Sequence, residues 1–108
     1  MHEGMSHLAP RATVSLTFDD ALPVHLDVAV PELDRAGLRG TFYVNAGADT
    51  VSARRQEWRA AAASGHELGN HTLFHPGVSS KAWVTDGIAI ENYTLDRMRV
   101  ELLAANRI

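Results

Sequence analysis

The sequence predicts an α/β protein built on a parallel sheet, because segments with the two-residue period of a strand alternate with segments that have helical spacing. Apolar and polar residues alternate over 13–18, and two further strand-like segments follow at 41–45 and 67–70. Helical patterns separate them. Strands joined through helices need crossover connections, and such connections produce parallel pairs. We therefore expect the order strand, helix, strand, helix, strand.

The first helix is expected from the apolar spacing of residues 22–33. Pro31 predicts a kink or a restart within it, and Gly37 predicts its C-terminal end. His25 lies on this helix, where exposure to solvent is the default expectation.

The second helix is expected over 53–64, with Ser52 as its cap and Gly65 as its end. Its buried face is predicted to consist of Trp58, Ala61 and Ala62. Core packing is also the expected role of Tyr43 and Trp83, although these rings and that of Trp58 have the chemistry to line a ligand cleft.

The last helix is expected over 93–106, with Asn92 or Thr94 as its cap. The apolar stripe of this helix comprises Leu95, Met98, Leu102 and Leu103. Residues 77–90 before it are expected to form a loop that Trp83 anchors.

Composition narrows the class of protein. The 108 residues are 45% hydrophobic and 21% charged, which is typical of one globular domain or a piece of one. A net charge of −3 offers no basic surface for nucleic acid, and the lack of cysteine excludes disulfides and thiolate ligands. No signal peptide or membrane-spanning segment is visible, so we expect no membrane partner and a cytoplasmic location, or secretion if the N-terminus is incomplete. Residues 1–12 are expected to be flexible, 13–108 form the domain, and the oligomeric state is left open.

His71 and His75 are the centre of the most informative segment, residues 65–76. Two imidazoles four residues apart can bind one divalent ion when the backbone turns between them. Gly69 and Pro76 exclude a regular helix, and Pro76 favours an extended conformation at His75. We expect the strand 67–70 to lead into a single turn that carries both rings.

Two neighbours of this pair are interpreted as supporting residues. His66 precedes the strand and is expected to be a structural histidine, hydrogen-bonded near the site. Glu67 is expected to be a carboxylate at the strand end or one that orients a ligating imidazole.

A third ligand is expected from Asp19 and Asp20, which end the first strand. One interpretation of Asp20 is an N-cap of the following helix. In parallel sheets, however, side chains at the carboxyl ends of strands gather at one edge, so the aspartates are expected to meet the histidines there. An Asp-His-His set leaves a metal open to water and to a substrate carbonyl, and the second aspartate can act as general base.

The combination of residues 17–20, Thr-Phe-Asp-Asp, with residues 71–75, His-Thr-Leu-Phe-His, resembles the first two motifs of the polysaccharide deacetylases. These proteins form the NodB-homology domain of carbohydrate esterase family 4. The resemblance also covers the Gly-Thr-Phe-Tyr-Val segment at 40–44. It implies a (β/α) barrel that removes acetyl groups from N- or O-acetylated sugars with a divalent metal. Asp19 then resembles the family's catalytic base, and Asp20, His71 and His75 resemble its metal ligands.

The metal itself is expected to be zinc, with cobalt, iron or nickel as alternatives, because carboxylate and imidazole suit all four. The substrate is expected to be an acetylated oligo- or polysaccharide. Two other functions fit the same residues: a non-catalytic module that binds metal or carbohydrate, and an amidase for small non-peptide amides.

The sequence departs from the family pattern at two places. Ala21 stands where the first motif has glycine, and no histidine follows His75 to act as general acid. Arg97 and Arg99 fall on the last helix rather than at a strand end. We therefore expect the first half of a barrel, truncated at Ile108, with weak activity or none.

Overall fold

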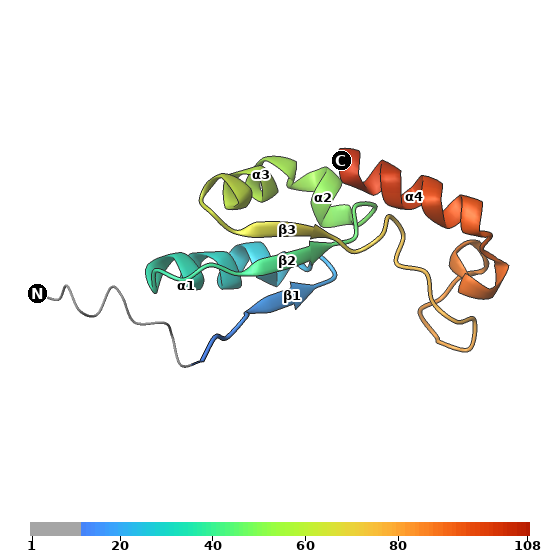
Figure 1. Ribbon diagram of the computed structural model, residues 1–108, viewed down its shortest axis with the longest axis horizontal. Coiled ribbons are helices and arrows are strands. Elements are labelled where there is room, and N and C mark those ends of the chain that lie inside the picture. The colour runs from blue at the N-terminus through green and yellow to red at the C-terminus, as the bar shows by residue number, and fades with distance from the viewer. Residues whose placement is uncertain (1–11) are drawn as a thin grey trace, which may run out of the picture.

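A computed structural model describes residues 12–108, and its centre is a three-stranded parallel sheet (Figure 1). The strands are β1 (Thr17–Asp19), β2 (Thr41–Val44) and β3 (Glu67–Asn70), paired in the order β1-β2-β3. Phe18 pairs with Phe42, and Phe42 in turn with Leu68. The predicted alternation of strands and helices and the parallel sheet are therefore confirmed. Residues 1–11, which belong to the predicted flexible N-terminus, lie outside the described part.

The first strand is shorter than predicted. Residues 13–16 alternate in polarity, but they lie outside β1 and Val14 is 79% exposed. The Thr41 N–H donates to the Leu16 carbonyl at 2.9 Å, and the pairing with β2 begins there. Among the described residues, no strand pairs with residues 13–15.

The helical segment after β1 consists of a π-helical turn, η2 (His25–Ala29), and an α-helix, α1 (Val30–Arg35). The Val30 N–H donates to the His25 carbonyl, five residues back. Pro31 has no N–H to donate and lies in the first turn of α1, where a proline is tolerated. The predicted restart at Pro31 is confirmed.

Two glycines end the helices as predicted. Gly37 has φ +72°, and the N–H groups of Gly37 and Leu38 donate to Asp34 and Leu33. Gly65 has φ +111° and ends α3 with the same pair of bonds. These are Schellman motifs, in which glycine adopts the left-handed conformation without steric cost.

The second crossover contains two helices, α2 (Asp49–Ala53) and α3 (Arg55–Ala63), where one was predicted. Arg54 separates the two helices, because its backbone, with φ −128° and ψ 36°, is not helical. Ser52 lies inside α2, where its hydroxyl donates to the Asp49 carbonyl, so its predicted role as a cap is wrong. Trp58 and Ala61 are buried as predicted, but Ala62 is exposed.

Residues 77–92 form an ordered connection rather than a plain loop. It includes two short helical turns, η3 (Asp86–Ile88) and η4 (Ile90–Asn92), and an isolated bridge between Gly77 and Ala89. Ala89 is 2% exposed, whereas Trp83 is 52% exposed. Ala89 is therefore the buried anchor of this connection, whereas Trp83, the expected anchor, is half-exposed.

The last helix is α4 (Leu95–Arg107), and Thr94 is its cap because its Oγ1 accepts from the Arg97 N–H at 3.0 Å. The predicted apolar stripe does not form a buried face. Leu95, Leu102 and Leu103 are exposed, and the buried residue of this helix is Glu101.

The core lies between the sheet and the helices of both crossovers, η2 and α3, which contact the sheet and each other on one face. Phe42 is fully buried there and stacks on Phe18, with ring centroids 4.9 Å apart. Tyr43, the next residue, points to the other face and is 37% exposed, so its expected core role is wrong. Within the described residues no helix is long and apolar enough to cross a bilayer.

Candidate metal centre

Asp20 lies at the carboxyl end of the sheet. Its N–H donates to the Tyr43 carbonyl of β2 at 3.1 Å, which continues the ladder one residue past β1. Asp20 and Ala21 have φ of +84° and +52°, and these left-handed residues turn the chain back toward η2. The helical segment has no side-chain cap, so the N-cap interpretation of Asp20 is wrong.

The turn after β3 carries both predicted histidines. The His71 N–H donates to the Val44 carbonyl at 3.0 Å, so this residue also extends the ladder. Thr72 Oγ1 then accepts from the His75 N–H at 2.8 Å and closes the turn. The expected extended conformation at His75 is wrong, because its φ is +53°. The closed turn brings the two rings together, with centroids 4.9 Å apart.

Asp20 and the two histidines converge, although 51 positions separate Asp20 from His71 in the sequence. One carboxylate oxygen of Asp20 lies 3.2 Å from Nε2 of His71 and 3.1 Å from Nε2 of His75. The three potential ligand atoms lie within 4.8 Å of one another. The side chains are about one-third to one-half exposed, at 47% for Asp20, 31% for His71 and 34% for His75. The arrangement is therefore open to solvent on one side.

Asp19 is the exposed last residue of β1 and is not one of the converging groups. Behind the aspartates lies His25, which is 6% exposed and packs edge-on to Phe18 at 5.6 Å. Its expected exposure is wrong. Burial lowers the pKa of the His25 imidazole, and the charges of Asp20 and Asp19 oppose that shift.

His66 and Glu67 lie at the opposite end of the sheet from this group. His66 is a buried structural histidine, as expected, but its partners are the Gly40 N–H at 3.1 Å and the Asp34 carboxylate at 2.7 Å. Glu67 is exposed and accepts a bond from Thr41 at 3.4 Å. Neither residue orients a ring of the candidate centre, so the expected position near the site and the orienting role are wrong.

A hollow adjoins the converging residues and includes groups that sequence reasoning missed. Its lining comprises Asp20, Asn45, Phe74, His75, Trp83 and Ile88. Asn45 follows β2 at the same edge, so its position after a strand was the available signal. The Oδ1 atom of Asn45 is buried and has no hydrogen-bond partner among the described residues.

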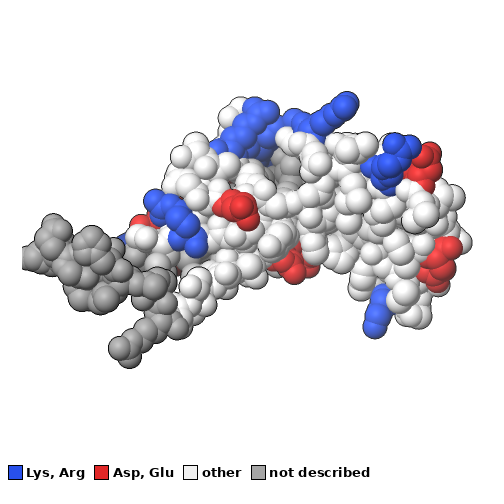
Figure 2. Space-filling view, in the orientation of Figure 1, with Lys and Arg blue, Asp and Glu red and all other residues white. Residues whose placement is uncertain are grey.

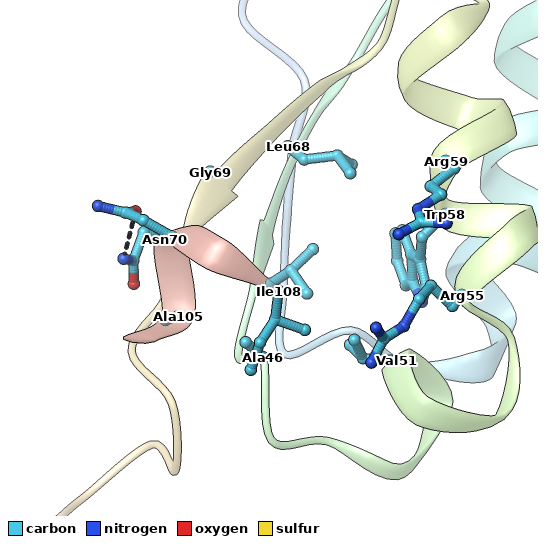
Figure 3. Close-up of a pocket in the computed structure, with 12 residues that line it drawn as sticks. Ala46, Val51, Arg55, Trp58, Arg59, Leu68, Gly69, Asn70, Ala105 and Ile108 are labelled. Carbon is cyan, nitrogen blue, oxygen red and sulfur yellow. Dashed lines mark hydrogen bonds between the residues drawn. The ribbon is translucent and has the colours of Figure 1, made fainter. Parts of the chain in front are cut away.

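A second hollow lies between α3, the sheet and the end of α4 (Figure 3). Trp58, Val51 and Leu68 give it an apolar lining, and Arg55 and Arg59 stand along α3 at its side. Basic side chains gather over α3 at the upper edge of Figure 2. None of the predicted catalytic or ligand residues lines this hollow, so the converging residues at the other hollow define the candidate centre.

The fold and the site define an α/β protein with helices on one sheet face and an Asp-His-His group where the parallel strands end. A sequence profile described as polysaccharide deacetylase matches residues 8–108, and the chain belongs to that family. A chitin deacetylase of Arthroderma benhamiae is 34% identical over 106 residues, which cover 88% of this chain and 25% of the relative. The chain therefore spans about a quarter of the length of that curated relative.

Solved structures show the same fold. A mutant pseudoenzyme of carbohydrate esterase family 4 with restored activity superposes with a TM-score of 0.64 at 24% identity, over 88% of this chain and 30% of that one. The chitin deacetylase of the fungal pathogen Colletotrichum lindemuthianum gives 0.56 at 23% identity, over 86% of this chain and 39% of its own. The sheet and helices of this chain thus correspond to part of a (β/α) barrel, as the family resemblance implies.

Proposed function

We propose that this chain carries the metal-binding part of a hydrolase that removes acetyl groups from N- or O-acetylated carbohydrate. The observation that carries the proposal is the approach of one Asp20 oxygen to the Nε2 atoms of both His71 and His75, at 3.2 and 3.1 Å. Membership of the deacetylase family and the chitin deacetylase relative support the substrate class.

The donor set fits a divalent ion of the zinc type. Ligand atoms about 2.0–2.1 Å from a tetrahedral ion lie about 3.3 Å from one another, close to the spacing of Asp20 with each histidine. Three protein ligands leave a position for water or substrate, and the partial exposure of all three side chains agrees with an open site. When bound, such an ion would polarise the acetyl carbonyl and make water more acidic.

The roles of the chain's own residues follow from their positions. His71 and His75 would bind the ion through Nε2, and Thr72 fixes the turn that aims the second ring. Asp19, beside Asp20 and outside the ligand group, would accept the proton of the attacking water. The exposed position of Asp19 at the end of β1 leaves its carboxylate available for this step.

Within the described residues, no further histidine joins the converging group to protonate the leaving group. No histidine follows His75, and Arg97 and Arg99 are engaged with Glu101 and Asp96. General acid catalysis contributes about 10²-fold to 10⁴-fold, so residues 1–108 alone are expected to release acetate slowly. A second candidate function is a module that binds metal and carbohydrate without hydrolysis.

Zinc titration of the 108-residue chain tests the metal proposal. Calorimetry is expected to show one strong site that Asp20→Asn and His71→Ala each abolish or weaken by at least about 100-fold, since each removes one of three ligands. Asp96→Asn is the matched control. It removes one exposed carboxylate from α4 and is expected to leave the affinity unchanged. Undiminished binding in either site variant would show that the site lies elsewhere.

An assay of acetate release separates the two functions. Acetylated chitooligosaccharide is incubated with the zinc-loaded chain and with its Asp19→Asn variant. Slow release that the variant loses would support the deacetylase with Asp19 as base. Oligosaccharide binding without acetate release would favour the binding module.

A further inference from the structure

Trp83 occupies an unusual place for a large aromatic residue. It is 52% exposed, yet its ring lies across that of His75, with centroids 5.1 Å apart at an interplanar angle of 72°. A Cβ atom on residue 77 would lie 2.4 Å from Trp83 Cη2, so Gly77 is needed beneath the indole. One part of the ring is thus held against the candidate ligand turn while the rest faces solvent.

Phe74 adds a second exposed aromatic ring to the same hollow. It is 46% exposed and lies in the turn between the two candidate ligands. The remaining wall is polar and contains Asp20, His75 and Asn45. A hollow with aromatic rings on some sides and hydrogen-bonding groups on others suits a ligand that has both an apolar face and polar edges.

The connection that carries Trp83 is fixed by side-chain bonds. Glu91 accepts from the Ser79 N–H and hydroxyl, with N···O distances of 3.0 and 3.1 Å. Arg97 of α4 donates to the Gly87 carbonyl at 2.7 Å. Because both ends of the connection are held, Trp83 is positioned in advance, which lowers the entropic cost of binding a ligand.

We propose that Trp83, with Phe74, forms a stacking platform for the pyranose ring that carries the acetyl group, beside the Asp20, His71 and His75 centre. The proposal rests on the proposed function and names the part of the chain that holds its substrate. A pyranose ring presents C–H groups on its face and hydroxyl groups at its edge, which matches the two kinds of wall. Asn45 contributes an amide whose buried oxygen has no partner among the described residues, and rotation of its side chain would offer that acceptor to a sugar hydroxyl or an acetamido N–H.

The chain has an internal control for this platform, because it has two tryptophans of opposite exposure. Trp83 is 52% exposed, whereas Trp58 is 3% exposed in the core. Triacetylchitotriose is titrated into the zinc-loaded, ¹⁵N-labelled chain, and the two indole N–H resonances are followed. The Trp83 resonance is expected to shift with the sugar while the Trp58 resonance stays in place.

Substitutions then measure the contribution of the ring. Trp83→Ala is expected to weaken triacetylchitotriose binding by about tenfold or more, and Trp83→Phe by about threefold, because the smaller ring still stacks. Leu95→Ala, which trims a 92% exposed side chain on α4, is the control and is expected to bind normally. Folding of each variant is checked by its amide spectrum, and Trp83→Phe keeps the test valid if Trp83→Ala unfolds.

The outcomes distinguish this inference from the proposed function. Zinc binding that depends on His71, combined with sugar binding that is unchanged in both Trp83 variants or absent, would overturn the platform and leave the metal centre intact. Zinc binding that does not depend on His71 would overturn the proposed function. Weaker sugar binding in both Trp83 variants, with the zinc affinity of the parent chain, supports the platform.

Discussion

Residues in the left-handed region of backbone space cluster at the candidate centre. The non-glycine residues with positive φ in the described part of the chain are Asp20, Ala21, Thr72 and His75. Each such residue costs on the order of 1 kcal/mol, and strain of this kind persists where the surrounding structure fixes it. Here the hydrogen bonds of the sheet ladder and of the Thr72 hydroxyl hold these residues in their left-handed conformations. In this arrangement Asp20 lies close to both imidazoles. Ala21 stands where the deacetylase motif has glycine, which adopts this conformation freely.

His25 is buried behind the candidate centre, and the protonation of its imidazole should affect the stability of the fold. Its imidazole is buried against Phe18 and Phe42, and its Nδ1 accepts from the Leu22 N–H at 3.2 Å. Burial lowers the pKa of His25 below its ordinary 6.5, against the opposing charges of Asp20 and Asp19. The unfolded chain therefore takes up a proton at a higher pH than the folded chain does, and protonation favours unfolding.

The prediction is that the stability conferred by neutral His25 is present above pH 6.5 and is lost as the pH falls from there through the lowered folded pKa. Urea unfolding is measured with a chelator present at several pH values across this range, for the parent chain and for His25→Gln. The parent should lose more stability than the variant on acidification, because glutamine does not titrate. Parallel pH profiles would contradict a buried neutral imidazole.

The helix and strand features that the sequence predicted correctly are those that depend on neighbouring residues. The strands at 41–45 and 67–70, the glycine helix ends and the Thr94 cap depend on residues close in sequence, and they were confirmed. The meeting of Asp20 with the histidines also followed from the sequence, because parallel topology fixes which strand ends share an edge.

The predictions that proved wrong concern features that depend on contacts with residues distant in sequence. Residues 13–15 have the polarity pattern of a strand, but no strand of the described part pairs with them. His25 is buried because it lies on the helix face that packs on the sheet. The stripe of α4 pointed to an apolar interface, whereas the buried contact of that helix is Glu101. No periodicity of one helix indicates that a charged side chain will be the one covered.

Glu101 links α4 to the connection before it. Its two carboxylate oxygens accept from the Tyr93 hydroxyl at 2.6 Å and from Arg97 Nε at 2.7 Å, and the Arg97 guanidinium lies 3.9 Å from the centre of the Tyr93 ring. Burial, and then the bond to Glu101, raise the pKa of the Tyr93 hydroxyl, so this group stays protonated and donates. The network joins α4 to the residues that precede it.

We predict that Glu101→Ala lowers the free energy of unfolding by about 2 kcal/mol, because it leaves the Tyr93 hydroxyl and the Nε–H of Arg97 without their acceptor. Asp96→Ala removes the exposed partner of Arg99 on the same helix and should change stability by less than about 0.5 kcal/mol. Urea denaturation of the two variants provides the comparison. Equal, small effects would show that the network contributes little.

The whole molecule has a small core for its surface. The buried hydrophobic residues of the described part are Ala21, Leu26, Leu33, Phe42, Val51, Trp58, Ala61 and Ala89. Large apolar side chains are exposed on the outer side of η2 and along α4, and within the described residues β1 and β3 each have one unpaired edge. Unpaired strands and exposed apolar faces promote association, so self-association of the isolated 108-residue chain should increase with its concentration.

A core of this size should depend heavily on its central residue. Phe42 has no exposed surface and contacts the rings of Phe18, Trp58, His25 and His66, with centroids 4.9–5.9 Å away. Phe42→Ala is expected to cost about 3–5 kcal/mol, which is most of the stability of a marginal domain. Far-ultraviolet circular dichroism should therefore show a largely unfolded chain, whereas the exposed Leu95→Ala should melt like the parent. Cooperative melting of Phe42→Ala near the parent temperature would show that stability resides outside the interface of sheet and helices, in the connection and α4.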